Sequence, residues 1–102
     1  MEKFYGEIDI TKKIMNIEYL KSEMLTSVAD IYKILSMGIN PDLNMEIRDE
    51  LSKVISISYI LGRKIGVSYS DIDKKIAQTL KEGLPGVFEE DADDLLKYLQ
   101  QG

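Results

Sequence analysis

The chain has 102 residues, of which 44% are hydrophobic and 30% charged, and its formal net charge is −5. This length predicts a single small domain, residues 1–102, that buries roughly two-thirds of the surface of its unfolded chain. The acidic balance excludes extended nucleic-acid or anionic-membrane surfaces, since both need clustered lysine and arginine.

The sequence contains neither cysteine nor histidine. Disulfides, thiol catalysis and imidazole chemistry are therefore excluded, and any chemistry depends on carboxylates, lysine or hydroxyls. A bound metal would be a hard ion such as Mg²⁺. No segment approaches the roughly 20 apolar residues that span a bilayer, so we expect a cytoplasmic protein without membrane contact.

The first expected element is a long amphipathic helix with Asp9 as its N-cap and Gly38 as its stop. Its apolar residues recur at steps of three and four, which keeps them on one face. They are Ile10, Ile14, Ile17, Leu20, Met24, Val28, Ile31 and Leu35.

A second helix is expected to begin at Asn40 as the cap, with Pro41 in the first turn, and to stop at Gly66. Its expected apolar stripe is Leu43, Ile47, Leu51, Val54, Leu61 and Ile65. Between Val54 and Leu61 this helix carries no charged residue, and apolar side chains point in nearly every direction around its axis.

Three neighbouring helices cannot cover such a segment on all sides, because each member of a four-helix bundle normally keeps one face toward solvent. We therefore expect the same helix of a second copy to cover the remaining face, which predicts a homo-oligomer, either a dimer or a tetramer. In the alternative, the N-terminal FYGEI segment folds over that face.

Two shorter helices are expected in the last third of the chain. The third has Ser70 as its cap, with Asp73 three residues later, and ends at Gly83. The fourth covers residues 89–101 and turns Leu95, Leu96 and Leu99 inward. Four helices without strands predict an all-α four-helix bundle.

Carboxylates on the first two helices form the one constellation that could carry chemistry. Glu23 and Asp30 share a face of the first helix, and Glu46 and Glu50 lie one turn apart on the second. In antiparallel helices these acids could converge on a divalent ion, which could hold a polyphosphate. In the alternative, they are the solvated edge of amphipathic helices, and Asp49 pairs with Lys53.

Three segments resemble a known family. ELSKVISISYILGRKIGVSYSDIDKKI and SEMLTSVADIYKIL resemble the two motif regions of MazG-like nucleotide pyrophosphohydrolases, and DITKKIMNIEYLKSEM resembles the opening of a small bacterial group of MazG-like proteins. The resemblance covers about residues 9–82. It implies an all-α fold, dimers or dimers of dimers and, in active members, Mg²⁺-dependent hydrolysis of nucleoside triphosphates to monophosphate and pyrophosphate.

The resemblance assigns the family's acidic residues position by position. The paired glutamates of the first motif fall on Thr26 and Ser27, and the third acid falls on Asp30. In the second motif the glutamate falls on Glu50, whereas the aspartate falls on Lys53. Two of the five expected acids are retained.

We therefore expect a MazG-like oligomer with degenerate metal motifs, a non-catalytic module that binds a nucleotide or phosphate, through Lys53, or another protein. A second hypothesis is an active Mg²⁺-dependent pyrophosphohydrolase with a rearranged ligand set of Glu23, Asp30, Glu46 and Glu50. A third is a helical adaptor with no nucleotide ligand.

Overall fold

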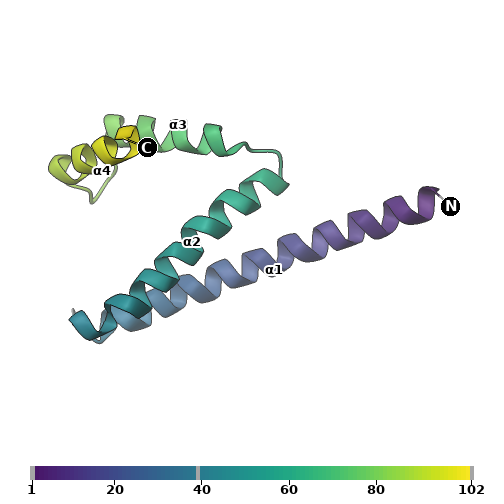
Figure 1. Ribbon diagram of the computed structural model, residues 1–102, viewed down its shortest axis with the longest axis horizontal. Coiled ribbons are helices and arrows are strands. Elements are labelled where there is room, and N and C mark those ends of the chain that lie inside the picture. Colours follow the sequence, from purple (N-terminus) through teal and green to yellow (C-terminus); the bar gives the residue numbers. More distant parts are fainter. Residues whose placement is uncertain (1, 39, 102) are drawn as a thin grey trace. The chain divides into compact units, whose positions relative to one another are not determined.

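The protein is all-α, as expected, and the part of the chain that the structure describes forms four α-helices and one short 3₁₀-helix (Figure 1). The computed structural model describes residues 2–38 and 40–101, with side chains from residue 10 onward, and no strand occurs in these ranges. The chain divides into two compact units, one ending at Gly66 and the other beginning at Val67. Each unit contains a pair of consecutive helices that pack against each other.

The first helix, α1, covers Glu2–Ser36 and is longer than expected. Asp9 was wrongly expected to be its N-cap, because the helix continues through that position to Glu2. The FYGEI segment also belongs to α1 instead of folding back. Residues 2–9 contain no proline and one glycine, so helix formation meets little local resistance there. Gly38 follows the helix with a φ of 92°.

The connection to the second helix uses the expected cap. The Asn40 side chain accepts a hydrogen bond from the backbone N–H of Asp42 at 3.0 Å, and the 3₁₀-helix η1 spans Pro41–Leu43. The helix α2 follows at Asn44–Lys64 and is succeeded by Gly66, whose φ of 96° suits a glycine stop. The cap therefore stabilises a 3₁₀ turn, and α2 itself begins one turn later.

The antiparallel helices α1 and α2 meet along a seam with alternating steps of three and four residues. This spacing is the 3.5-residue repeat of helices that pack side by side. At these positions side chains are buried or half-buried: Ile17, Leu20, Met24, Ser27, Ile31 and Ile34 on α1, and Leu43, Ile47, Glu50, Val54, Ile57, Leu61 and Lys64 on α2. Leu51 was expected in this seam but is exposed, and Glu50 takes its place.

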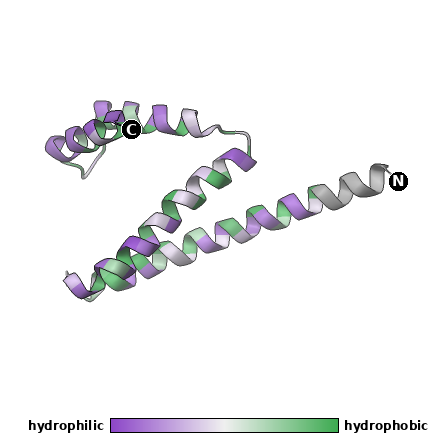
Figure 2. Cartoon of the chain, viewed as in Figure 1, coloured by the Kyte–Doolittle hydropathy of each residue, from purple (hydrophilic) through white to green (hydrophobic). Residues whose placement is uncertain are grey.

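Much apolar surface of this first unit stays uncovered. On α2, Ile55 and Ile60 are 59% and 43% exposed. The α1 seam begins near Ile17, so roughly 20 Å of α1 extends past the end of α2 at 1.5 Å per residue, and Ile10 and Ile14 are exposed there. Hydrophobic residues accordingly occur on several sides of α2 (Figure 2).

The second unit is a shorter hairpin of α3, Tyr69–Glu82, and α4, Glu89–Gln101. Its cap is Ser68, whose hydroxyl accepts a hydrogen bond from the backbone N–H of Asp71 at 3.0 Å; the expectation of Ser70 was wrong. Both serines precede an aspartate by three residues, so spacing alone does not distinguish them. Gly83 ends α3 as expected.

The interior of this hairpin is apolar. Leu80 and Ala92 are 8% and 6% exposed and Leu96 is half-buried, whereas Leu95 and Leu99, expected to face inward, remain exposed. Leu95 lines an apolar cavity of about 460 Å³ together with Ile72 and Ile76. Among the described residues, no helix has the length and hydropathy required to cross a membrane.

Candidate functional site

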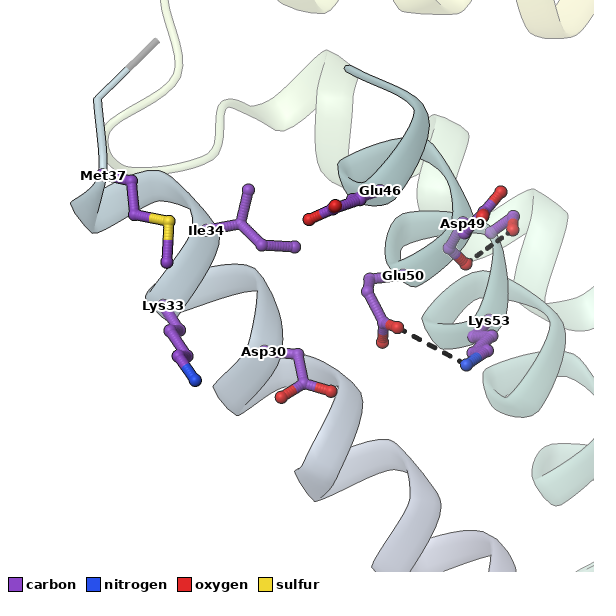
Figure 3. Close-up of a pocket in the computed structure, with 9 residues that line it drawn as sticks. Asp30, Lys33, Ile34, Met37, Glu46, Asp49, Glu50 and Lys53 are labelled. Carbon is purple, nitrogen blue, oxygen red and sulfur yellow. Dashed lines mark hydrogen bonds and ion pairs between the residues drawn. The ribbon is translucent and has the colours of Figure 1, made fainter. Parts of the chain in front are cut away.

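A pocket of about 640 Å³ lies between the C-terminal part of α1 and the N-terminal half of α2 (Figure 3). The structure brings three of the four predicted acids to it, namely Asp30, Glu46 and Glu50. Glu23 does not line the pocket; it lies two turns before Asp30 on α1, about 10 Å along the helix. The remaining lining residues are Lys33, Ile34, Met37, Asp49, Ser52 and Lys53.

Glu50 is the most enclosed acid of this pocket, because it occupies a seam position of α2. Its side chain is 16% exposed. Its Oε1 atom accepts a hydrogen bond from Lys53 Nζ at 3.4 Å. The other carboxylate oxygen, Oε2, is buried and has no hydrogen-bond partner among the described residues. An unpaired buried oxygen costs stability, so this position is not chosen for packing alone.

Lys53 pairs with Glu50 and not with Asp49, which corrects the expected Asp49–Lys53 pair. The two residues lie three positions apart, within reach on one helix face. The Lys53 side chain is 56% exposed and lies beside Glu50 on α2 (Figure 3). The Asp49 backbone carbonyl accepts a hydrogen bond from the Ser52 hydroxyl at 2.8 Å.

The positions of the first motif have a different role from the pocket residues. Ser27 lies in the seam and is 2% exposed. Among the described residues it is the one polar residue that is buried. Thr26, its neighbour, is exposed. Neither lines the pocket. The spacing of the sequence could have predicted Ser27 as a seam residue, because it lies three residues after Met24 and four before Ile31. A stripe traced through apolar residues alone leaves Ser27 out, because serine is polar.

The electrostatics of the pocket are acidic, with four carboxylates and two lysines among its lining residues. A bare phosphate would meet net repulsion there. The pocket does not favour a divalent cation either, because the Lys53 ammonium already contacts the carboxylate of Glu50, the most enclosed acid. No group of three aspartates or glutamates in the described ranges is placed to hold a metal ion. As arranged, the residues do not fit Mg²⁺.

The chain belongs to the MazG-like family, whose model matches residues 10–95. The match covers residues 10–36 of α1, all of α2 and α3, and the first half of α4. The family suggests a fold related to nucleotide pyrophosphohydrolases. A search of curated proteins and a search of solved structures each gave no match.

Proposed function

We propose that this protein is a MazG-like homo-oligomer without pyrophosphohydrolase activity, and that it works as a protein-interaction module. The observation that carries this proposal is the burial of Ser27 at 2% exposure. The resemblance aligns a metal-binding glutamate with this position. In this chain the position packs α1 against α2, and a serine there supplies no charge to offset a cation.

The second support is the Lys53 ammonium, which stands where the resemblance places an aspartate. Magnesium sites for polyphosphate need several negative oxygens, and a positive group 3.4 Å from Glu50 opposes a second cation. Together the two positions remove acidic ligands from both motif helices. The protein keeps the helical scaffold and loses the charges that active members would need.

Oligomer formation is supported by the apolar residues that the first unit leaves exposed. Singly exposed hydrophobic side chains are ordinary, but contiguous ones mark interaction surfaces. Here Ile10 and Ile14 on α1 and Ile55 and Ile60 on α2 are all exposed. A second copy is the occupant we propose, because α1 extends past α2 by a length that a two-fold-related hairpin could cover. Self-association and binding of other proteins would use the same kind of surface.

The experiment is a screen for pyrophosphate release from each common ribonucleoside and deoxyribonucleoside triphosphate, with and without Mg²⁺. We expect no release above a protein-free control. Mg²⁺-dependent release that disappears in Asp30→Ala and in Glu50→Ala, with helical circular dichroism retained, would overturn the proposal. Matched control variants are Asp42→Ala and Asp71→Ala, both outside the pocket.

One observation favours the second hypothesis, an active pyrophosphohydrolase with rearranged ligands. Asp30, Glu46 and Glu50 line the same pocket, although they come from two helices. A substrate-bound ion could draw these carboxylates together, in which case activity would depend on all three. Activity that survives each single alanine substitution would remove this candidate.

A further inference from the structure

The second hairpin has an open apolar cavity of about 460 Å³, the α3–α4 groove, which lies wholly within the second unit. Six of the nine described residues that line it are aliphatic, namely Val67, Ile72, Ile76, Leu80, Leu84 and Leu95. We propose that this groove binds an amphipathic helix of another protein, with lysine or arginine beside the apolar face of that helix. The inference rests on the proposed role as a protein-interaction module and assigns the partner its chemistry.

The groove has the length and composition that a partner helix requires. Ile72, Ile76 and Leu80 follow one another at steps of four along α3, so their stripe runs for about 12 Å, or roughly two helical turns. Leu84 and Leu95 line the same cavity and are 44% and 42% exposed. A third helix in the groove would cover apolar side chains of both α3 and α4, with its own anchors three and four residues apart.

The charge of the second unit favours a basic partner. Residues 67–102 contain eight acidic and four basic side chains, which gives a net charge of −4, whereas residues 1–66 contain ten and nine, which gives −1. Four of the five net negative charges of the chain therefore belong to the unit that contains the groove. The same hairpin of a second copy would meet like charge, and so would an anionic lipid surface.

Acidic side chains also lie directly beside the groove. A second cavity of about 400 Å³ in the same hairpin shares Leu80 and Leu84 with the groove. Its described lining residues include one lysine and three exposed carboxylates, which are Glu82, Glu89 and Asp93. A helix with its apolar face in the groove would bring its flanking residues close to these carboxylates, so lysine or arginine there would be attracted and glutamate repelled.

The test uses the full chain and a fluorescein-labelled peptide of leucine and lysine, about five helical turns long, with leucine on one face of its helix. Fluorescence anisotropy should give a dissociation constant in the micromolar range. A peptide with glutamate in place of every lysine should bind at least about tenfold more weakly, and so should a scrambled leucine–lysine peptide without an apolar face. Equal binding of the scrambled peptide would overturn the inference, because charge alone would then explain the affinity.

The apolar wall of the groove is tested by Leu84→Gln combined with Leu95→Gln. The double variant should bind the leucine–lysine peptide at least about tenfold more weakly, because two contacts with its apolar face are lost. Both leucines are more than 40% exposed, so the fold should be retained, which circular dichroism checks. The matched control is Leu25→Gln with Leu35→Gln, at exposed positions of α1, and should change the affinity less than about twofold. Unchanged binding by the groove variant would overturn the inference.

The contribution of charge is tested by the same substitution at two lysines of this hairpin. Lys75 lines the groove, whereas Lys97 on α4 lines neither of the two cavities. Lys75→Glu should tighten binding of the leucine–lysine peptide about threefold, and Lys97→Glu should change it less than about 1.5-fold. Equal gains at the two positions would contradict a groove-specific partner, since the overall charge of the chain would then be responsible.

A second copy of this chain is the competing occupant of the groove. If the peptide does not bind and the double groove variant lowers the mass of an oligomer, the groove is an interface between copies and the inference fails. Absence of peptide binding in a chain that releases no pyrophosphate overturns the inference alone. Mg²⁺-dependent pyrophosphate release by a chain that binds the peptide as expected overturns only the proposed loss of catalysis.

Discussion

The two helical hairpins of this protein bury different kinds of residue. The α3–α4 hairpin closes over Leu80 and Ala92 and places its charges outside. The α1–α2 hairpin instead puts Ser27 and Glu50 in its seam, while Ile55 and Ile60 are exposed. Two polar side chains therefore interrupt a largely apolar seam in the first hairpin, whereas the buried residues of the second hairpin are apolar.

The comparison also separates two reasons for keeping a polar residue in the seam. Ser27 is small, and a hydroxyl can be accommodated at a close helix contact. Glu50 is large and charged, with one oxygen unpaired. Burial of this carboxylate lowers the stability of the fold, and packing contacts do not offset that loss, which indicates a role for Glu50 in the pocket.

The largest expected effect concerns the exposed face of α2. Ile55→Glu combined with Ile60→Glu should raise the dissociation constant of the oligomer at least about a hundredfold, because two side chains worth about 1.5–3 kcal/mol each would be replaced by charges. Sedimentation equilibrium measures the change. Gln100→Glu at the exposed end of α4 is the charge control. An unchanged mass for the double variant would place the interface elsewhere.

Next in size is the restoration of an acid in the seam. Ser27→Glu should lower the free energy of unfolding by about 3 kcal/mol, because a charge would be buried at a position with 2% exposure. Ser27→Ala should change it by less than about 1 kcal/mol. Urea denaturation followed by circular dichroism gives both values. Full stability of Ser27→Glu would mean that the seam opens to water at this point.

A smaller effect is expected in the second hairpin. Leu80→Ala should cost about 2 kcal/mol of unfolding free energy through loss of buried area and a residual cavity. The matched variant Leu99→Ala, at a position 39% exposed, should cost less than about 1 kcal/mol. Thermal unfolding of the two variants provides the comparison. Equal losses would show that Leu99 is covered in solution.

The smallest expected effect has the opposite sign. Glu50→Leu should raise the free energy of unfolding by about 1 kcal/mol, because a half-paired carboxylate in the seam would be replaced by an apolar group of similar size. Asp49→Leu on the exposed side of α2 is the control and should change it by less than about 0.5 kcal/mol. Destabilisation by Glu50→Leu would indicate that Oε2 has a hydrogen-bond partner in solution.

Sequence patterns predicted the helices well and the seam less well. The cap at Asn40 and the stops at Gly38, Gly66 and Gly83 depend on the local chemistry of those residues, so the sequence alone is enough to predict them. Leu51 was misplaced because a 3.6-residue stripe drifts from the 3.5-residue repeat of paired helices, and only the partner helix decides between Glu50 and Leu51.

The candidate site was predictable in composition but not in detail. Asp30, Glu46 and Glu50 line one pocket because α1 and α2 run antiparallel. Glu23 lies too far along α1 to join them, since seven residues advance a helix by about 10 Å. The choice of Lys53 between Asp49 and Glu50 depends on rotamers and burial that spacing does not encode.

The account depends most on the claim that one chain leaves the apolar surface of its α1–α2 hairpin uncovered. Sedimentation equilibrium of the unaltered protein tests it most directly. We predict a mass of at least twice the 11.6 kDa of one chain at micromolar concentration. A stable monomer of 11.6 kDa under those conditions would contradict it.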